Sequence, residues 1–328
     1  MSFYNCFRRF ILLVAVLALM FGGVAGCEPA PVEPPGAEPP PLPDELQQTG
    51  QEPPTLLVYI AEEGTVEEMD FEEYIAGVVA GEMNPTWPIE ALAAQAIIAR
   101  TFTLQKIAED GGVPERNAHA STDIEEFQAY SAEDITDEVR EAVQMTRGEV
   151  ATHNNEFIRG WFSAYAGPRT AMADEGLGFE GENPPYIHVV DGPGQEIIPE
   201  EEGEWSESFP LEKVRNVVRE TTGEDPGEVT QVEIKEFGPS GRAATIQVND
   251  TEIAGPTLRL GLGSTEMRSN FLEELSVEDG MLKMSGSGFG HGVGLCQWGA
   301  RAMAENGSSP EEIVHYFYKD ISLAKVWE

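Results

Sequence analysis

Residues 74–101 read YIAGVVAGEMNPTWPIEALAAQAIIART, and this stretch decides the fold. Its first apolar residues recur at the spacing of one helix face: Ile75, Val78 and Val79. Asp70 precedes them as an N-cap, and Glu73 stands three residues later, where a capping-box partner would be. The pattern therefore predicts a short helix that ends near Gly81.

A second helix is predicted directly after the first. Pro88 suits the first turn of a helix, because proline needs no hydrogen-bond partner there. The helical pattern runs from there to about Glu109, and Gly111-Gly112 end it. Its many alanines indicate close packing against a neighbouring element.

The remaining chain alternates between strand-like and helical patterns in separate blocks. We expect these further elements: a strand at 56–60, a helix at 134–146, a hairpin at 148–162, strands at 229–237 and 243–248, and helices at 295–306 and 309–318. Because helices and strands are segregated, the fold class is predicted as α+β, with a helical segment packed on antiparallel hairpins and sheets.

The N-terminal segment has the pattern of an export signal. Arg8 and Arg9 precede an apolar run at 10–20, and small residues lead to Cys27. The end, Val-Ala-Gly-Cys, resembles the lipobox of bacterial lipoproteins, which implies a signal peptide at 1–26 and lipidation of Cys27. The alternative is an uncleaved anchor helix. Both alternatives place the remaining chain outside the cytoplasmic membrane, and the first anchors it to the outer face.

Proline and acidic residues dominate the next segment, 27–54. Such a composition cannot build a hydrophobic core and is typical of a stiff spacer. We therefore expect a tether at 27–54 and one folded domain at 55–328.

The charge balance excludes one class of function. The chain has 58 Asp and Glu against 20 Lys and Arg, a formal net charge of -38. No useful basic patch can exist in that field, so nucleic-acid binding is excluded. The three cysteines are scattered and form no CxxC pair, and Cys296 is expected to be a small buried residue. His119 and Asp123 are too few to indicate a metal site, and neither a metal nor a cofactor is predicted.

Glu82 is the leading candidate for catalysis. It stands between two predicted helices with apolar neighbours on both sides, which would desolvate its carboxyl group and raise its pKa. A raised pKa is what a general acid needs near neutral pH. The alternative is a solvent-exposed glutamate of a very acidic protein, which the context alone favours.

A glycine-rich loop at 286–294 surrounds His291. It lacks the spacing of a dinucleotide-binding or P-loop motif. Its glycines are expected to let the backbone approach a sugar or another strand closely. A lone histidine is more often structural than catalytic.

Four blocks together resemble the SpoIID/LytB family of bacterial cell-wall proteins. They are Tyr74–Met83 with Trp87–Leu92, Ala94–Ala96 and Ala99–Thr101; Gln128–Tyr130; Trp161–Thr170 with Pro184–Tyr186; and Gly288–Ala300 with Pro310–Ile313 and Tyr316–Tyr318. The resemblance spans about 56–327, and the part at 190–280 is weakly matched.

The resemblance implies two different activities. Some relatives are lytic transglycosylases that cut peptidoglycan glycan strands lacking stem peptides during engulfment in sporulation. Their catalytic acid lies in the Glu-Met turn, which corresponds here to Glu82. Other relatives stimulate a cell-wall amidase. The chain departs from many relatives at Ala93, where they carry Lys, and at 123–127, which lacks the zinc-binding Cys of some relatives.

We therefore expect a lipid-anchored lytic transglycosylase that cuts between N-acetylmuramic acid and N-acetylglucosamine, with Glu82 as its acid and base. The alternatives are a wall-binding protein that stimulates an N-acetylmuramoyl-L-alanine amidase, and a carbohydrate-binding lipoprotein without activity. The family blocks give these candidates to line the sugar groove: Arg100, Gln128, Tyr130, Ser163, Thr170, His291 and Gln297.

Overall fold

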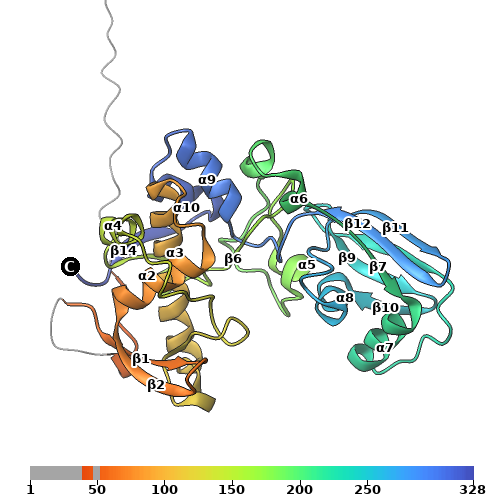
Figure 1. Ribbon diagram of the computed structural model, residues 1–328, viewed down its shortest axis with the longest axis horizontal. Helices are drawn as coiled ribbons and strands as arrows, with labels where there is room; N and C mark the ends of the chain where they lie inside the picture. Colours follow the sequence, from red (N-terminus) through yellow and green to blue (C-terminus); the bar gives the residue numbers. More distant parts are fainter. Residues whose placement is uncertain (1–38, 47–51) are drawn as a thin grey trace, which may run out of the picture. The chain divides into compact units, whose positions relative to one another are not determined.

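The computed structural model describes residues 39–46 and 52–328, so the predicted signal peptide and Cys27 lie outside the described residues (Figure 1). Among the described residues, no helix has the length and hydropathy needed to cross a bilayer. The first part of the chain contains η1 (Asp44–Leu46), β1 (Thr55–Ile60), β2 (Thr65–Asp70), α2 (Phe71–Glu82), α3 (Ile89–Asp110), η2 (Pro114–Arg116), β3 (Ala120–Ser121), α4 (Asp137–Met145), β4 (Glu149–His153), β5 (Glu156–Phe157) and β6 (Phe162–Ser163).

The second part contains α5 (Ala173–Leu177), η3 (Pro193–Glu196), α6 (Glu200–Gly203), β7 (Glu204–Pro210), α7 (Leu211–Thr222), β8 (Val232–Phe237), β9 (Ala243–Val248), β10 (Thr251–Ala254), α8 (Gly255–Leu262), β11 (Leu272–Glu278), β12 (Met281–Ser287), β13 (Leu295–Cys296), α9 (Gln297–Glu305), α10 (Pro310–Phe317) and β14 (Ser322–Lys325). The strands form small sheets, in the orders β2-β1-β3, β10-β9-β8, β11-β12-β7, β13-β6 and β14-β4-β5. Most pairs are antiparallel, and the predicted α+β class is confirmed.

Helix boundaries follow local capping. The Asp70 carboxylate accepts hydrogen bonds from the Glu72 and Glu73 backbone N–H groups, at 2.9 and 3.1 Å, which confirms the predicted N-cap of α2. The predicted capping box is wrong, because the Glu73 carboxylate pairs with Arg140 of α4 instead. The helix predicted at 134–146 is shorter, since Thr136 caps α4 and accepts from the Val139 N–H.

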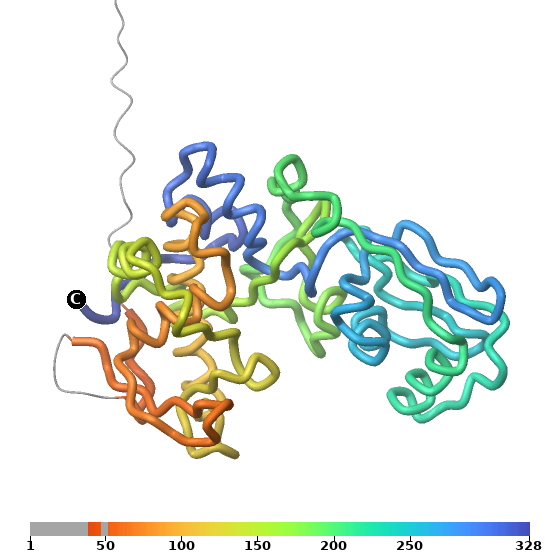
Figure 2. Tube along the Cα trace, viewed as in Figure 1, coloured from red at the N-terminus to blue at the C-terminus, as the bar shows by residue number. Residues whose placement is uncertain are grey.

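The buried apolar residues form two clusters. The larger joins α2, α3 and α4 to the C-terminal α9, α10 and β14. Figure 2 shows these early and late parts of the chain side by side. The smaller cluster belongs to the segment from β7 to β12, which is the part that the sequence motifs matched weakly. This segment has its own hydrophobic core, whereas the sequence predicted a single undivided domain at 55–328.

Arg242, in the turn after β8, connects the smaller cluster to the larger one. Its side chain is fully buried and donates to the backbone carbonyls of Arg169 and Ala166, at 2.9 and 2.5 Å. Gly292 has no side chain that would collide with this guanidinium, since a Cβ there would lie 2.1 Å from Nη2. A glycine of the 286–294 loop therefore makes room for this contact.

The folded part begins earlier than predicted. Leu46 is only 2% exposed and belongs to the larger core, although we expected a tether at 27–54. Pro40 and Pro43 are buried as well. The proline-rich composition hid this contact because only two leucines of the segment, Leu42 and Leu46, pack against the core.

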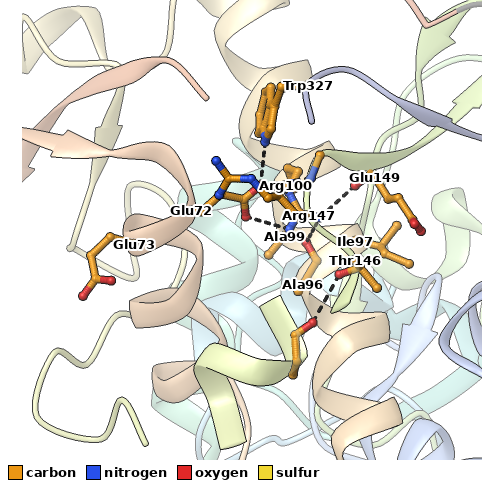
Figure 3. Close-up of polar contacts among 12 residues, drawn as sticks. Glu72, Glu73, Ala96, Ile97, Ala99, Arg100, Thr146, Arg147, Glu149 and Trp327 are labelled. Atoms are coloured by element: carbon orange, nitrogen blue, oxygen red, sulfur yellow. Dashed lines mark hydrogen bonds and ion pairs between the residues drawn. The ribbon is translucent and has the colours of Figure 1, made fainter. Parts of the chain in front are cut away.

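An ion pair at the start of α2 joins α2, α3 and β4 to the C-terminal segment (Figure 3). Arg100 of α3 donates to both carboxylate oxygens of Glu72, at 3.2 and 2.8 Å, and to the Glu149 carbonyl at 2.8 Å. The same carboxylate accepts from the Gly148 N–H at 3.0 Å and from the Trp327 indole at 2.7 Å. Glu72, Arg100, Gly148 and Trp327 are all buried, so the bonds among them are shielded from water.

Removing one partner of this ion pair should be costly. The variant Arg100→Met leaves the Glu72 carboxylate buried without its countercharge, and we expect the free energy of unfolding to fall by about 3–5 kcal/mol. Urea unfolding of the full chain measures this. The matched control is Arg215→Met, which breaks an exposed pair with Asp225 and should cost far less, because solvent screens exposed charges. Equal losses in both variants would show that the buried pair has no special weight.

Candidate active site

Glu82 is the last residue of α2, where the helix stops. Its side chain is partly buried, and its Oε1 accepts a hydrogen bond from the Ala129 backbone N–H at 2.7 Å. The carboxyl group is therefore held by the segment at 127–131, which lies 47 residues further along the chain. The turn into α3 begins at Met83, which is buried in the core.

Two glycines allow that segment to lie against α2. A Cβ at Gly81 would lie 2.7 Å from the Tyr130 backbone nitrogen, and a Cβ at Gly77 would lie 2.1 Å from the Tyr130 ring. The Ser131 N–H donates to the Gly77 carbonyl at 2.9 Å and fixes the register. A larger residue at Gly81 would push the Ala129 backbone away from Glu82, and one at Gly77 would displace the Tyr130 ring.

The environment keeps Glu82 protonated up to neutral pH. Burial raises the pKa of this carboxyl group to about 7, while the Ala129 N–H and the Gln297 amide act in the opposite direction. Hydrogen bonding favours the charged form and burial the neutral form, and the effect of burial on the pKa is the larger. The predicted rise in pKa therefore has the predicted cause.

Gln297 reaches Glu82 from the other end of the chain. It is the first residue of α9, is 4% exposed, and its amide lies close enough to affect the Glu82 pKa. No hydrogen bond of regular geometry joins the two side chains, since the Gln297 Nε2 has no hydrogen-bond partner among the described residues. This buried donor is therefore free to bond to an oxygen atom beside Glu82.

An aromatic cluster adjoins this end of the site. Trp87, in the turn after Glu82, packs on Trp298 with ring centroids 4.8 Å apart. The Arg301 guanidinium lies over both rings, at 5.2 and 4.9 Å from their centroids. Trp298 is 7% exposed and packs in the core, while Trp87 is partly exposed.

Tyr130 and Gln128, two other predicted groove residues, stand on either side of Ala129 in the chain. Tyr130 follows Ala129 and stacks on Tyr74 at 5.8 Å. Gln128 is 2% exposed and donates to the Thr103 hydroxyl at 3.0 Å. The partly exposed Tyr130 ring packs along α2, and Gln128 positions the segment.

Arg100 and Thr170 do not face a groove. Both are fully buried. Arg100 is committed to the ion pair with Glu72, and the Thr170 hydroxyl bonds to the His188 carbonyl and the Val190 N–H at 3.0 and 2.9 Å. Their predicted role as sugar-contacting residues is wrong, because burial leaves them no surface for a ligand.

Ser163 and His291 belong to the junction of the third and fourth sequence blocks. Ser163 pairs with Cys296 across β6 and β13, and its hydroxyl has no partner among the described residues. The His291 Nδ1 accepts from the Val293 N–H at 3.0 Å, and burial together with nearby Arg259 lowers the His291 pKa to about 3. A neutral histidine held in this way serves the structure.

The glycine-rich loop contacts another strand, which was one of its two expected roles. Tyr165 and Phe289 exchange backbone hydrogen bonds of 3.0 and 2.7 Å. A Cβ at Gly294 would lie 2.1 Å from the Trp161 carbonyl, and one at Gly290 would lie 2.7 Å from the Ser163 Cβ. Cys296 is completely buried, as predicted.

The arrangement can donate a proton at neutral pH and then hold the resulting carboxylate. Glu82 supplies the proton, the Ala129 N–H stabilises the anion, and the Gln297 amide can orient an oxygen of a bound molecule. Sequence reasoning missed Ala129, because a backbone N–H carries no side-chain signature. The spacing of Gly77 and Gly81 before Glu82 was the available signal.

Glu82→Gln should stabilise the protein above neutral pH. The folded pKa of about 7 lies above the ordinary value of 4.5, so wild type loses stability as pH rises from about 4.5 to 7. A glutamine has no charge to desolvate and can still accept from the Ala129 N–H. We expect the variant to be more stable by about 3 kcal/mol at pH 8 and to lose this advantage below pH 5. Urea unfolding at several pH values checks this, and a constant difference at every pH would contradict it.

Gly81→Ala should detach the Ala129 N–H from Glu82. The new methyl group meets the Tyr130 backbone, which cannot yield without moving the whole segment. We expect the free energy of unfolding to fall by about 1–3 kcal/mol. The pKa of Glu82 should rise further, since a hydrogen bond to its charged form is lost. Carboxyl carbon NMR titration measures that pKa, and an unchanged value would contradict the proposed contact.

Comparison with known proteins supports the resemblance found in the motifs. A family model described as SpoIID, Stage II sporulation protein, matches residues 59–153, which include Glu82 and the segment that holds it. Stage II sporulation protein D of Bacillus subtilis is 28% identical over 297 residues, covering 83% of this chain and 80% of that protein. An uncharacterized protein of Brachyspira hyodysenteriae is 30% identical over 261 residues, covering 79% of this chain and 67% of its own.

A protein described as an amidase enhancer is similar as well. It comes from Bacillus subtilis and is 26% identical over 294 residues, which are 76% of this chain but 40% of that protein. The same family is indicated by the sequence motifs, by the segment that the family model matches and by the extent of the similarity to these relatives. The chain belongs to the SpoIID/LytB family.

Proposed function

We propose that the protein is a lytic transglycosylase of peptidoglycan in which Glu82 is the catalytic acid and base. One observation carries the proposal: a partly buried carboxyl group, held by a backbone N–H, whose pKa is raised to about 7. Such a group is protonated in a useful fraction at neutral pH. The similarity to a stage II sporulation protein supports a substrate in the cell wall.

The reaction requires only one carboxyl group. Glu82 gives its proton to the glycosidic oxygen, which leaves as the 4-hydroxyl of N-acetylglucosamine. The C6 hydroxyl of the N-acetylmuramic acid then attacks C1 of the same sugar, and its proton returns to the Glu82 carboxylate. The product is a 1,6-anhydro ring, and no water is consumed. Because the nucleophile is tethered to the reacting sugar, a second carboxylate becomes unnecessary.

The neighbours of Glu82 fit this sequence of charge states. When the proton leaves, the Ala129 N–H stabilises the carboxylate that remains, so the second step starts from a prepared base. The free Gln297 Nε2 donates to a sugar hydroxyl or acetamido oxygen in the site. Trp87 offers a partly exposed ring for a sugar face.

The direct test is a product assay with the full chain in a non-ionic detergent. Purified glycan strands, with and without stem peptides, are incubated with wild type, and mass spectrometry detects 1,6-anhydro ends. We expect these ends from wild type, with strands that lack stem peptides as the better substrate. The variant Glu82→Gln should lose at least about a thousandfold in rate, since general acid catalysis contributes about that much.

Glu68→Gln is the matched control, because it removes an exposed carboxyl of β2 without touching the site. Its rate should stay within twofold of wild type. The rate of wild type should fall about tenfold per pH unit above pH 7, as Glu82 loses its proton. Anhydro ends that persist in Glu82→Gln would overturn the assignment.

The second candidate function is stimulation of a cell-wall amidase. The similarity to an amidase enhancer favours it. A purified N-acetylmuramoyl-L-alanine amidase, assayed with and without this protein, distinguishes the two. Stimulation that survives in Glu82→Gln, together with no anhydro ends from wild type, would establish the enhancer function. Glycan binding without either effect would leave a carbohydrate-binding protein.

We further propose that the chain is anchored by a lipid on Cys27, outside the cytoplasmic membrane. A wall substrate requires this location. The lipobox-like sequence before Cys27 supports the anchor. Mass spectrometry of the chain purified from membranes measures the attached lipid, and Cys27→Ser should release the chain or leave its signal uncleaved.

A further inference from the structure

Two adjoining cavities lie at the start of β7, outside the site at Glu82. One has a volume of about 440 Å³ and the other about 300 Å³. Both are lined by the same three carboxylates: Glu200, Glu204 and Glu273. Because they share these residues, the two cavities form one acidic groove over α6 and the ends of β7 and β11.

The carboxylates of this groove have no countercharge. Among the described residues, the side chains of the three shared glutamates and of Glu201 have neither an ion-pair nor a hydrogen-bond partner, and no Lys or Arg lines either cavity. The neighbouring Arg268 donates to the Glu201 backbone carbonyl at 2.9 Å and lies over the Phe289 ring. The groove therefore keeps its full negative charge, which a bound cation would relieve.

Local structure aims these side chains at one place. In the antiparallel pairing of β12 with β7, Ser287 faces Glu204. On the other side of β12, the register with β11 shifts between Leu272 and Glu274, so Glu273 occupies a β-bulge. A bulge redirects a side chain relative to the regular alternation. Glu204 on β7 and Glu273 on β11 therefore lie on opposite sides of the central strand β12.

A buried hydroxyl provides an independent sign of a ligand. Ser287 lines the smaller cavity and is 6% exposed, and its Oγ has no hydrogen-bond partner among the described residues. Gly167 also lies near this hydroxyl, and a Cβ there would lie 3.4 Å from the Oγ. A buried hydroxyl without a partner is costly unless a ligand satisfies it.

The spacing of the acids argues against a metal ion. Among residues 39–46 and 52–328, no group of three or more His, Cys, Asp or Glu could hold one. Carboxylates that are spread along a groove match charges that are spread along a chain. Tyr165, Ile198 and Trp205 give the walls apolar surface, which suits the methylene groups between such charges.

We propose that this groove binds a linear aliphatic amine that carries two or more ammonium groups. The ammonium groups pair with Glu200, Glu204 and Glu273, and one of them donates to the Ser287 Oγ. The same chemistry occurs in free polyamines and in the side-chain amines of peptides. The proposal does not depend on the activity of Glu82.

Isothermal titration calorimetry of the full chain tests the proposal. The probes are spermine, a peptide amide with two lysines, the same peptide acetylated on both lysine amines, and calcium chloride, at 50 and 300 mM salt. We expect one equivalent of an amine to bind and the acetylated peptide not to bind. If spermine alone binds, the source is a free polyamine. If the peptide binds as tightly, the source includes peptide amines.

The net charge of -38 makes a charge-matched control necessary. The triple variant Glu200→Gln/Glu204→Gln/Glu273→Gln should weaken amine binding at least tenfold. The control Glu62→Gln/Glu67→Gln/Glu68→Gln removes the same charge from an exposed edge and should stay within twofold of wild type. Equal weakening in both variants would overturn the proposal, because binding would then be unspecific.

Ser287→Ala tests the groove without changing its charge. The hydroxyl has no partner in the fold, so the variant should keep its melting temperature. Amine binding should weaken about three- to tenfold, as expected for one lost hydrogen bond to a charged group. Unchanged amine affinity in Ser287→Ala would overturn the proposal. The proposal would also fail if calcium bound saturably and displaced the amine while the acetylated peptide still bound.

Discussion

The buried contact between Glu72 and Arg100 is the constraint on which the rest of the structure depends. It fixes the first turn of α2 against α3, and the same carboxylate holds the backbone before β4 and the C-terminal Trp327. Charges inside a core are tolerated only when every oxygen and nitrogen is satisfied in one geometry. Chain segments from both ends are therefore held in a single arrangement, and α2 starts from a fixed point.

The position of Glu82 follows from that fixed point. It lies ten residues further along α2, which is about 15 Å in a regular helix. Gly77 and Gly81 then admit the segment whose Ala129 N–H binds the carboxyl group. The rigid helix supplies the placement and the glycines supply the partner. A general acid requires both the placement and the partner, because its pKa depends on the groups that surround its carboxyl.

Solvent exposure gives the carboxyl groups of this acidic protein two different properties. At Glu82, burial raises the pKa of a single carboxyl group and stores a proton near neutral pH. At the groove beside β7, the carboxylates stay exposed and gather negative charge without a countercharge. Exposure decides between these outcomes: a desolvated acid takes up a proton, whereas a solvated cluster attracts a cation.

The sequence by itself determined the helices around Glu82, the α+β class, the family and the candidate acid, because these depend on local spacing and on long motifs. It misplaced Arg100 and Thr170, since a polar residue in a motif looks the same whether it faces a ligand or closes a buried contact. Only the tertiary structure decided which residues meet: Ala129 and Gln297 reach Glu82 from distant segments, and a second core forms from β7 to β12. Burial and long-range hydrogen bonds depend on which distant segments of the chain pack together, and no local sequence pattern carries that information.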